Sequence, residues 1–323
     1  MTAEELKITI STILNDVISQ QIYFILRRDD TFILRLADIE DDSATPALKN
    51  MFVEYIHNKV IENNDLQLCQ LSVDDERDNA IYQYDYDMYP EALGLINDFD
   101  ISKATVSIEK FDFSKDDLSA LFGYIIYLGN MESGITMFKK HYPISLIKRD
   151  SLLLGAIKSK QRFEKVSGED IIRINGTIQL FKVANQIYVI DVKTLEQSMG
   201  FCQLVQQAAE QTIDAVKKLG IIEDIEVLKD SIEEVSFARK LSKVKRTSPI
   251  FSLGISKETI IEFTKNTPEL LGKFKYSEDG NTIRLDTKKS KDAFVKLMND
   301  SFLRSELTKQ YYEASAKDQL VAN

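Results

Sequence analysis

Two stretches decide the fold: GYIIYLGNMESGITMFKKHY, residues 123–142, and TIQLFKVANQIYVIDV, residues 177–192. Both consist of short apolar runs interrupted by Gly, Asn or Ser, which is typical of antiparallel strands joined by turns. Two more short runs lie between them, KQRFEKV (160–166) and DIIRI (170–174). Asn175–Gly176 is the strongest hairpin signal here, because Asn and Gly tolerate the positive φ of a type I′ turn. The region therefore predicts an antiparallel β-meander.

Helical periodicity replaces these runs on the C-terminal side of the meander. Apolar residues recur at helical spacing from Lys193 onward, and Gly220 is a typical helix stop. The Asp279–Gly280 pair predicts the tip of another hairpin. Further helices are predicted at 231–244, 257–265 and 288–298.

The N-terminal part mixes both kinds of pattern. A helix is predicted over residues 4–19, a hairpin around 27–30, and a second helix over 45–61, where Thr-Pro favours a helix start. We therefore predict an α+β protein with two domains. Residues 1–122 form an acidic N-terminal mixed α/β domain, and residues 123–323 form a basic domain in which the β-meander packs with the C-terminal helices.

Composition excludes several classes of protein. A chain of 323 residues exceeds the size at which one hydrophobic core usually stops growing. Two cysteines exclude a disulfide framework, and with two histidines there are too few ligands at suitable spacing for a zinc site. No apolar run approaches the ~20 residues that span a bilayer, and the N-terminus lacks signal-peptide features. We expect a cytoplasmic protein with no cofactor, and no motif demands catalysis.

The charge is unevenly distributed. The net charge is −10, but residues 1–130 carry 10 Lys and Arg against 25 Asp and Glu, whereas residues 131–323 carry 31 against 26. This asymmetry indicates two surfaces with different partners. The acidic, tyrosine-rich stretch at 74–89 has two interpretations. It is either a docking surface for a basic partner, or even a nucleic-acid mimic, or it is a solvated loop followed by a strand with half-buried tyrosines.

Basic residues gather in groups that could bind a phosphate backbone, because such binding needs several cations on one surface and no particular sequence. The alternative is a solvated helix face or a lysine-guarded strand edge. Our candidate nucleic-acid-binding residues form two groups. The first basic group consists of Lys139, Lys140, Lys148, Arg149, Lys158, Lys160, Arg162 and Lys165, and the second consists of Arg239, Lys240, Lys243, Lys245 and Arg246. A third basic group consists of Lys288, Lys289 and Lys291.

An alternative catalytic hypothesis is a metal-dependent nuclease. Asp191-Val192-Lys193 follows an apolar strand, and Asp170 lies upstream. Two carboxylates would hold a divalent cation, and the lysine would position the attacking water. The competing interpretation makes Asp191 a turn residue, with Thr194 as the cap of the following helix.

Three segments resemble the KwaB-like family, the soluble component of the two-gene Kiwa anti-phage defence system. They are VANQIYVIDVKTLEQSMGF (183–201), FARKLSKVKRTSPIF (237–251) and LMNDSFLRSELTKQYYEASAKDQL (297–320), and the likeness extends over roughly the last 200 residues. The resemblance implies a homodimer that binds double-stranded DNA without strong sequence preference. It also implies association with the membrane protein KwaA at the inner face of the inner membrane.

The same resemblance implies that the protein hinders phage DNA replication and late transcription, and that a phage-encoded inhibitor is a possible further partner. It supplies no catalytic residues and no residue-level DNA-binding motif. The lysine and arginine candidates therefore rest on their charge and clustering alone. A third hypothesis is an adaptor that contacts no nucleic acid and docks a basic partner through its acidic part.

Overall fold

The computed structural model describes residues 1–16, 19–29, 31–39, 44–71, 79–143, 146–147, 154–157, 162–165, 171–305 and 307–313. The chain divides into two compact units. Unit 1 contains the described residues of Met1–Leu68, Asn79–Tyr84 and Tyr89–Met199, and unit 2 those of Cys69–Asp78, Asp85–Met88 and Gly200–Asn323.

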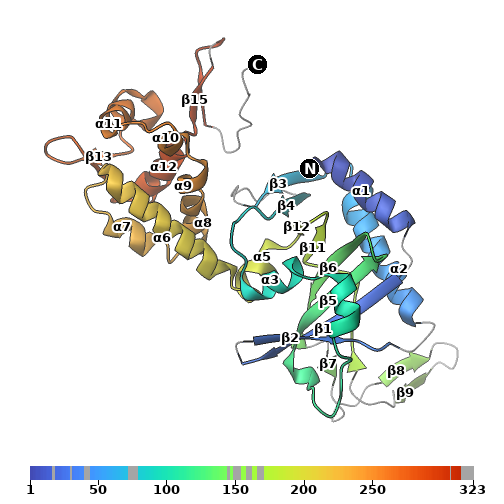
Figure 1. The fold of residues 1–323 in the computed structure, drawn as a ribbon. Coiled ribbons are helices and arrows are strands. Elements are labelled where there is room, and N and C mark those ends of the chain that lie inside the picture. Colours follow the sequence, from blue (N-terminus) through green and yellow to red (C-terminus); the bar gives the residue numbers. More distant parts are fainter. Residues whose placement is uncertain are drawn as a thin grey trace. The chain divides into compact units, whose positions relative to one another are not determined.

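Unit 1 is built on an eight-stranded sheet with the order β2-β1-β5-β6-β11-β12-β4-β3 (Figure 1). The pairs β1–β2, β1–β5, β5–β6, β6–β11, β11–β12 and β12–β4 are all antiparallel. The strands are β1 (Ser19–Arg28), β2 (Thr31–Leu36), β3 (Gln67–Gln70), β4 (Ala80–Gln83), β5 (Leu121–Gly129), β6 (Gly134–Lys140), β11 (Leu180–Val183) and β12 (Gln186–Val189). Together with the helices, this confirms the α+β class.

The sheet runs across the position where the sequence predicted a domain boundary. Residues 122 and 123 lie inside β5, which pairs with β1 on one side and β6 on the other. The strands of the N-terminal part and those of the meander therefore share one sheet. Local sequence carries no signal for such a pairing, because about a hundred residues separate β1 from β5.

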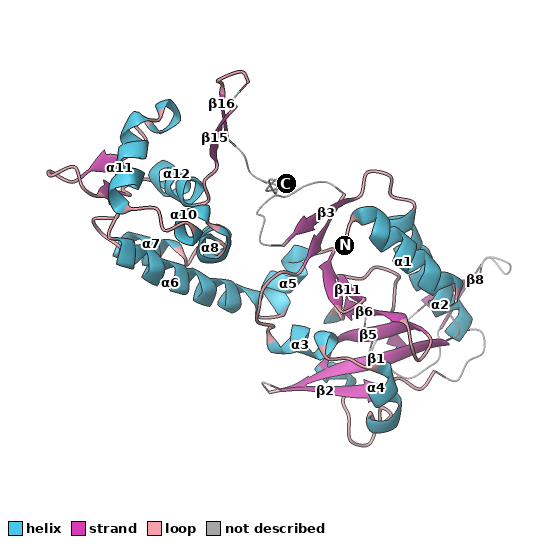
Figure 2. Ribbon diagram, turned by 45° about the horizontal axis from the view of Figure 1, so that its top comes forward, coloured by secondary structure: helices cyan, strands magenta, loops and turns pink. Residues whose placement is uncertain are grey.

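Side-chain alternation gives the sheet two buried faces. On β5, Ile126 and Leu128 belong to the core that includes residues of α1 (Ala3–Asn15) and α2 (Ala44–Ile56), so these helices cover one face. On the other face, Phe99 packs edge-on against Tyr23, with ring centroids 5.2 Å apart. Phe99 lies between α3 (Glu91–Asn97) and α4 (Ile101–Ser107), which Figure 2 shows on the opposite side from α1 and α2.

One predicted hairpin is wrong. β10 (Ile171–Ile172), which precedes Asn175–Gly176, pairs with β7 (Leu146–Ile147) and not with β11. The tight turn lies instead at Ala184–Asn185, between β11 and β12, where φ is +48° and +61°. The KQRFEKV run likewise lies outside the main sheet, because β9 (Arg162–Lys165) pairs only with β8 (Leu154–Ile157) in the described chain. An Asn-Gly pair favours a turn but does not choose a strand's partner.

Unit 2 is mainly helical. Its longest helix, α6 (Phe201–Leu219), ends at Gly220, whose φ of +64° confirms the predicted stop. The Asp279–Gly280 hairpin is also confirmed, between β13 (Lys275–Tyr276) and β14 (Ile283–Arg284). The remaining elements are α7 (Glu226–Ser231), α8 (Val235–Ser242), α9 (Val244–Thr247), α10 (Pro249–Ser252), α11 (Lys257–Asn266), α12 (Lys288–Met298), β15 (Phe302–Arg304) and β16 (Tyr311–Glu313). α5 (Val192–Ser198) belongs to unit 1.

Candidate nucleic-acid interface

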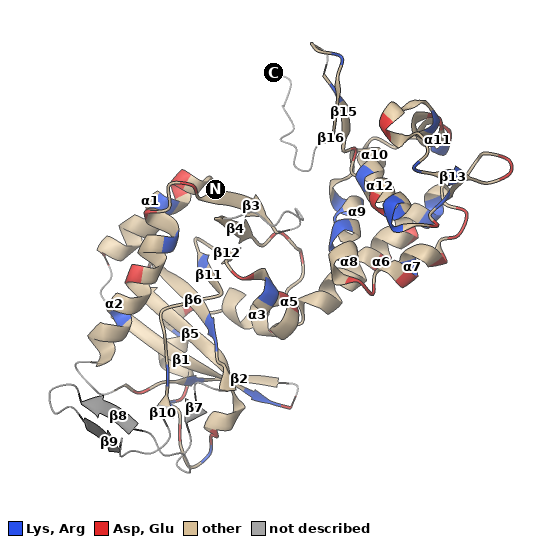
Figure 3. Ribbon diagram, turned by 180° about the vertical axis from the view of Figure 1, so that it is seen from behind, with Lys and Arg blue, Asp and Glu red and all other residues tan. Residues whose placement is uncertain are grey.

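The second basic group lies on α8 and α9 of unit 2. The apolar residues of these helices, Phe237, Leu241 and Val244, are buried in the core of the unit. The basic residues occupy the positions between them, so the helix period places them toward the surface: Lys245 and Arg246 are exposed, and Arg239, Lys240 and Lys243 are half-buried. Figure 3 shows Lys and Arg positions along this part of the chain and along α12.

Arg246 and Arg239 lie on the side of α8–α9 that faces Tyr86. The Arg246 guanidinium donates to the Asp85 carbonyl oxygen and to Asp85 Oδ2, the latter at 2.8 Å, and lies 5.4 Å from the Tyr86 ring centroid. The pKa of the Tyr86 hydroxyl is raised, chiefly by burial and also by the Asp85 charge, although the hydrogen bond with Ser242 and the charges of Arg246 and Arg239 act in the opposite direction. These contacts hold the guanidinium of Arg246 in a fixed position.

Lys240 lies on the other side, next to the third basic group. Lys288 at the start of α12 pairs with Glu234, with Nζ and Oε1 3.3 Å apart. The hydrogen bond from Ser236 and that from Lys288, together with the charges of Lys288 and Lys240, lower the pKa of Glu234. The structure therefore brings the second and third basic groups together around one carboxylate.

A hollow of about 270 Å³ lies beside the second group. Its lining combines two cations and one carboxylate with apolar, hydroxyl and amide groups: Tyr86, Asp87, Met88, Leu204, Ala208, Gln211, Ser242, Lys245 and Arg246. Lys245 Nζ reaches Gln211 Oε1 on α6 at 3.4 Å. The interface candidate thus consists of α8, α9 and the start of α12, with this hollow at one side.

The first basic group belongs to unit 1 and is only partly described. Lys148, Arg149, Lys158 and Lys160 lie outside the described residues, and only the backbones of Arg162 and Lys165 are described, in β9. Lys139 is buried, and Lys140 is half-buried with its Nζ 5.8 Å from the Phe122 ring centroid. A phosphate contact by Lys139 therefore requires a ligand that enters its pocket, because its amine does not reach the open surface.

The nuclease candidates do not form a metal site among the described residues. Asp191 caps α5, since its carboxylate accepts hydrogen bonds from the Thr194 backbone amide at 3.2 Å and from Thr194 Oγ1 at 2.8 Å. Lys193 is exposed in the first turn of α5, and Asp170 lies outside the described residues. The described part of the chain has no group of three or more His, Cys, Asp or Glu arranged to hold a metal ion. The predicted helix start is right, but the cap is Asp191 and not Thr194.

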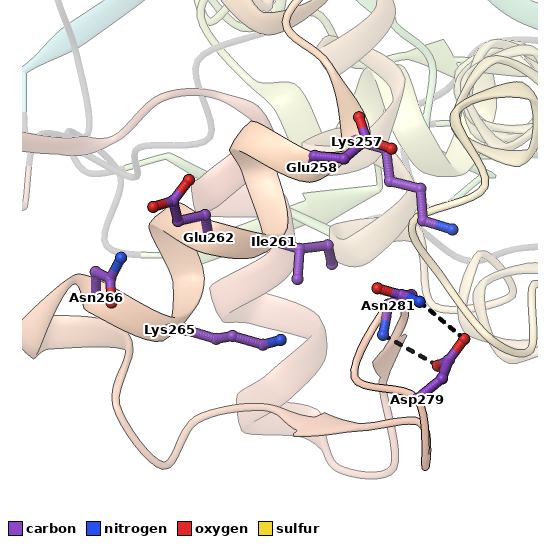
Figure 4. Close-up of a pocket in the computed structure, with 8 residues that line it drawn as sticks. All are labelled: Lys257, Glu258, Ile261, Glu262, Lys265, Asn266, Asp279 and Asn281. Atoms are coloured by element: carbon purple, nitrogen blue, oxygen red, sulfur yellow. Dashed lines mark hydrogen bonds between the residues drawn. The ribbon is translucent and has the colours of Figure 1, made fainter.

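A further hollow of unit 2 is lined by charges of both signs (Figure 4). It measures about 500 Å³ between α11 and the β13–β14 hairpin. Lys265 donates to the Gly280 carbonyl at 2.8 Å, and Asp279 accepts from the backbone and side-chain amides of Asn281 at 3.0 Å each. Hydrogen bonds from Ser277 and Asn281 lower the pKa of Asp279 to about 2. The Lys265 hydrogen bond links the hairpin to α11, and the Asp279 hydrogen bonds stabilise the turn within the hairpin.

Comparison with known proteins identifies the family. A family profile described as Kiwa protein KwaB-like matches residues 118–308. The chain belongs to this family. It is also 29% identical over 326 residues to the Kiwa protein KwaB of Escherichia coli O55:H7 (strain RM12579 / EPEC), with 99% of each chain covered. No solved structure matches the chain. The resemblance is confirmed, and the KwaB-like protein is a component of Kiwa anti-phage defence.

The family match includes all three basic groups of this KwaB-like protein, which lie between Lys139 and Lys291. No helix in the described part of the chain is long and apolar enough to cross a bilayer. Sequence reasoning missed two residues next to the first group, the cation Arg173 and the buried His141, which line the same pocket as Lys139. Arg173 follows a strand that pairs outside the main sheet, so its nearness to Lys139 had no local signal.

Proposed function

We propose that this KwaB-like protein acts in Kiwa defence by binding double-stranded DNA through α8, α9 and the start of α12. One observation carries the proposal: residues 235–247, which include α8 and α9, contain five Lys or Arg and no Asp or Glu. The fold adds Lys288 to this segment at Glu234. Several cations on one surface are what binding to a phosphate backbone requires.

The proposed contact is made with phosphates and not with base edges. Phosphate contacts position a protein on DNA without carrying sequence information, so weak sequence preference is the expected behaviour. The net charge of −10 opposes DNA binding over most of the surface, so the attraction must be local. A homodimer would present the surface twice and raise the effective concentration of the second contact.

The complete proposal includes the partners that the resemblance implies. The protein would be a homodimer held at the inner face of the inner membrane by KwaA, where bound phage DNA could not be replicated or transcribed freely. Recruitment is tested by fractionating cells with and without KwaA. The protein should enter the membrane fraction only when KwaA is present, and its presence there without KwaA would contradict this part of the proposal.

The DNA contact is tested by a salt series. Replacing Lys240, Lys243 and Lys245 with Gln should make the slope of log affinity against log salt shallower by about 3, one unit for each lost phosphate contact. The loss should be the same for duplexes of unrelated sequence. Binding is measured by fluorescence anisotropy with labelled duplex DNA.

A control with the same change in net charge is available in unit 1. Lys103, Lys110 and Lys115 are largely exposed, and their replacement by Gln should leave the slope unchanged. Equal effects of the two triple variants would show that net charge matters and that the surface is wrong. The first basic group stays a prediction: charge reversal at Lys158, Lys160 and Arg162 together should weaken binding to all sequences alike. Binding as tight as that of the wild type would show that this surface is wrong.

A further inference from the structure

A second cationic site lies in unit 1, at the end of the β5–β6 hairpin strands. It is a pocket of about 250 Å³ whose lining includes Lys139, Lys140, His141, Arg173, Asn175 and Tyr124. None of the described lining residues is acidic. The pocket thus brings together two lysines, one arginine and one histidine. Buried lysines in proteins are normally paired with carboxylates, and the described lining supplies none.

Lys139 is the most unusual of these residues, because its side chain is only 4% exposed. Its Nζ donates to Asn175 Oδ1, to the Thr177 carbonyl oxygen at 2.9 Å and to Thr177 Oγ1 at 3.4 Å. All of these acceptors are neutral. Burial lowers the pKa of Lys139 to about 8, so a cation is held here at neutral pH at an energetic cost that an anion would relieve.

The groups around Lys139 leave room for a bound anion to pair with its amine. His141 is 6% exposed, and its Nδ1 lies 2.8 Å from the Tyr124 hydroxyl. Burial and the charge of Lys139 lower the pKa of His141. One carboxylate, Asp191, acts on Lys140, but both of its oxygens accept hydrogen bonds from Thr194. Arg173 is exposed at the rim, where its guanidinium is accessible to a ligand.

We propose that this pocket binds a phosphate group. Its volume lies below the roughly 300–1,000 Å³ of sites for drug-sized ligands, so it suits a small anionic group and not an extended molecule. A lysine supplies a point charge to a phosphate, and an arginine supplies two parallel donors. This site is separate from the α8–α9 surface, and its existence does not depend on the proposed DNA contact.

The phosphate group can belong to a free nucleotide or to the end of a nucleic-acid strand, and the choice of probe distinguishes these two sources. Calorimetric titration compares inorganic phosphate, a nucleoside 5′-monophosphate and the unphosphorylated nucleoside. A second comparison uses short single-stranded oligonucleotides with a 5′-phosphate or a 5′-hydroxyl. Tighter binding of the monophosphate than of the nucleoside assigns a free nucleotide, and preference for the 5′-phosphorylated strand assigns a nucleic-acid end. Either preference supports the site.

Arg173→Gln is the decisive variant, because Arg173 is exposed and its loss leaves the buried network intact. Affinity for the phosphate probes should fall about tenfold or more, the effect of removing hydrogen bonds to a charged group. Lys103→Gln, which removes an exposed cation from α4, is the matched control and should bind as the wild type does. Lys139→Met should abolish binding while the circular dichroism spectrum stays native.

The proposal fails if the wild-type protein binds neither inorganic phosphate nor the monophosphate at millimolar concentration. It fails equally if Arg173→Gln binds the probes as tightly as the Lys103→Gln control. The triple Gln variant of α8–α9 should retain phosphate binding in this pocket. That result separates failure of this site from failure of the DNA interface.

Discussion

Asp191 lies between β12 and α5, and its carboxylate caps the N-terminus of α5. Asp191→Ala removes the hydrogen bonds to Thr194 and should lower the free energy of unfolding by about 1 kcal/mol, the usual cost of losing an N-cap. Asp191→Asn should cost much less, because Asn caps helices about as well as Asp. Urea denaturation of the three proteins measures the difference, and an Asn variant as unstable as the Ala variant would contradict the capping role.

The same pair of variants gives a clean test of the nuclease hypothesis. Asp191→Asn keeps the cap but removes the negative charge that a divalent cation requires. We expect purified protein with magnesium or manganese to leave phage DNA uncut. Cutting that is present in the wild type and absent in Asp191→Asn would establish the metal site, and no loss of stability would obscure the result.

Lys139 should make stability depend on pH in a defined window. Its pKa is about 8 in the folded protein, against 10.5 in the unfolded chain. Between these values the unfolded state binds the proton and the folded state does not, so stability rises with pH. The free energy of unfolding of the wild type, relative to Lys139→Met, should therefore increase from pH 8 to pH 10.5. A constant difference between the two would show that the amine is not desolvated.

The difference between the two proteins is the useful quantity because tyrosines act in the opposite direction. Burial raises the pKa of Tyr23 to about 12, so the folded state keeps a proton that the unfolded state loses above pH 10. This effect lowers the stability of both proteins alike and cancels in the comparison. Denaturant unfolding at several pH values supplies all the data.

At the level of elements, the β5–β6 hairpin depends on Gly134. A Cβ at this position would overlap the Tyr127 ring, whose hydroxyl donates to the Asn130 carbonyl oxygen at 2.5 Å. Gly134→Ala should lower the free energy of unfolding by about 1–3 kcal/mol through this overlap. Gly94→Ala is the control, because a Cβ there meets nothing within 4 Å in α3, and Ala should stabilise the helix by about 0.5–1 kcal/mol. Thermal or urea unfolding distinguishes the opposite signs.

Sequence predicted those elements whose signals are local. The helix predicted over 288–298 has the observed bounds of α12, and Gly220 and Asp279–Gly280 act as expected. Partner choice between strands was not predictable, as Asn175–Gly176 shows, because pairing depends on residues far apart in the chain. The two candidate binding sites also depend on contacts between residues far apart in the chain, which the sequence does not show. Clustering indicated Lys240 and Lys139, but only packing brings Lys288 to Glu234 and buries Lys139 with neutral partners.

The whole molecule has a separate hydrophobic core in each unit. Ile126 is fully buried in the sheet core of unit 1, and Phe294 is fully buried on α12 of unit 2. Ile126→Ala and Phe294→Ala should each cost about 3 kcal/mol. Because each unit has its own core, we expect two calorimetric transitions, each shifted by one variant only. A single transition that both substitutions shift would show that the units unfold together.

Tyr86 adds a consequence for the synthesis of the chain. It belongs to the short segment Asp85–Met88 of unit 2, and its hydroxyl meets Ser242, which follows 156 residues later. At a translation rate of about 5–20 residues per second, the ribosome needs about 8–30 s to supply that partner. The flanking strands of unit 1 can form during this interval, whereas Tyr86 must stay available outside them. Tyr86 is therefore made early and waits for the helices of unit 2, and termination before Ser242 leaves this tyrosine exposed to chaperones and proteases.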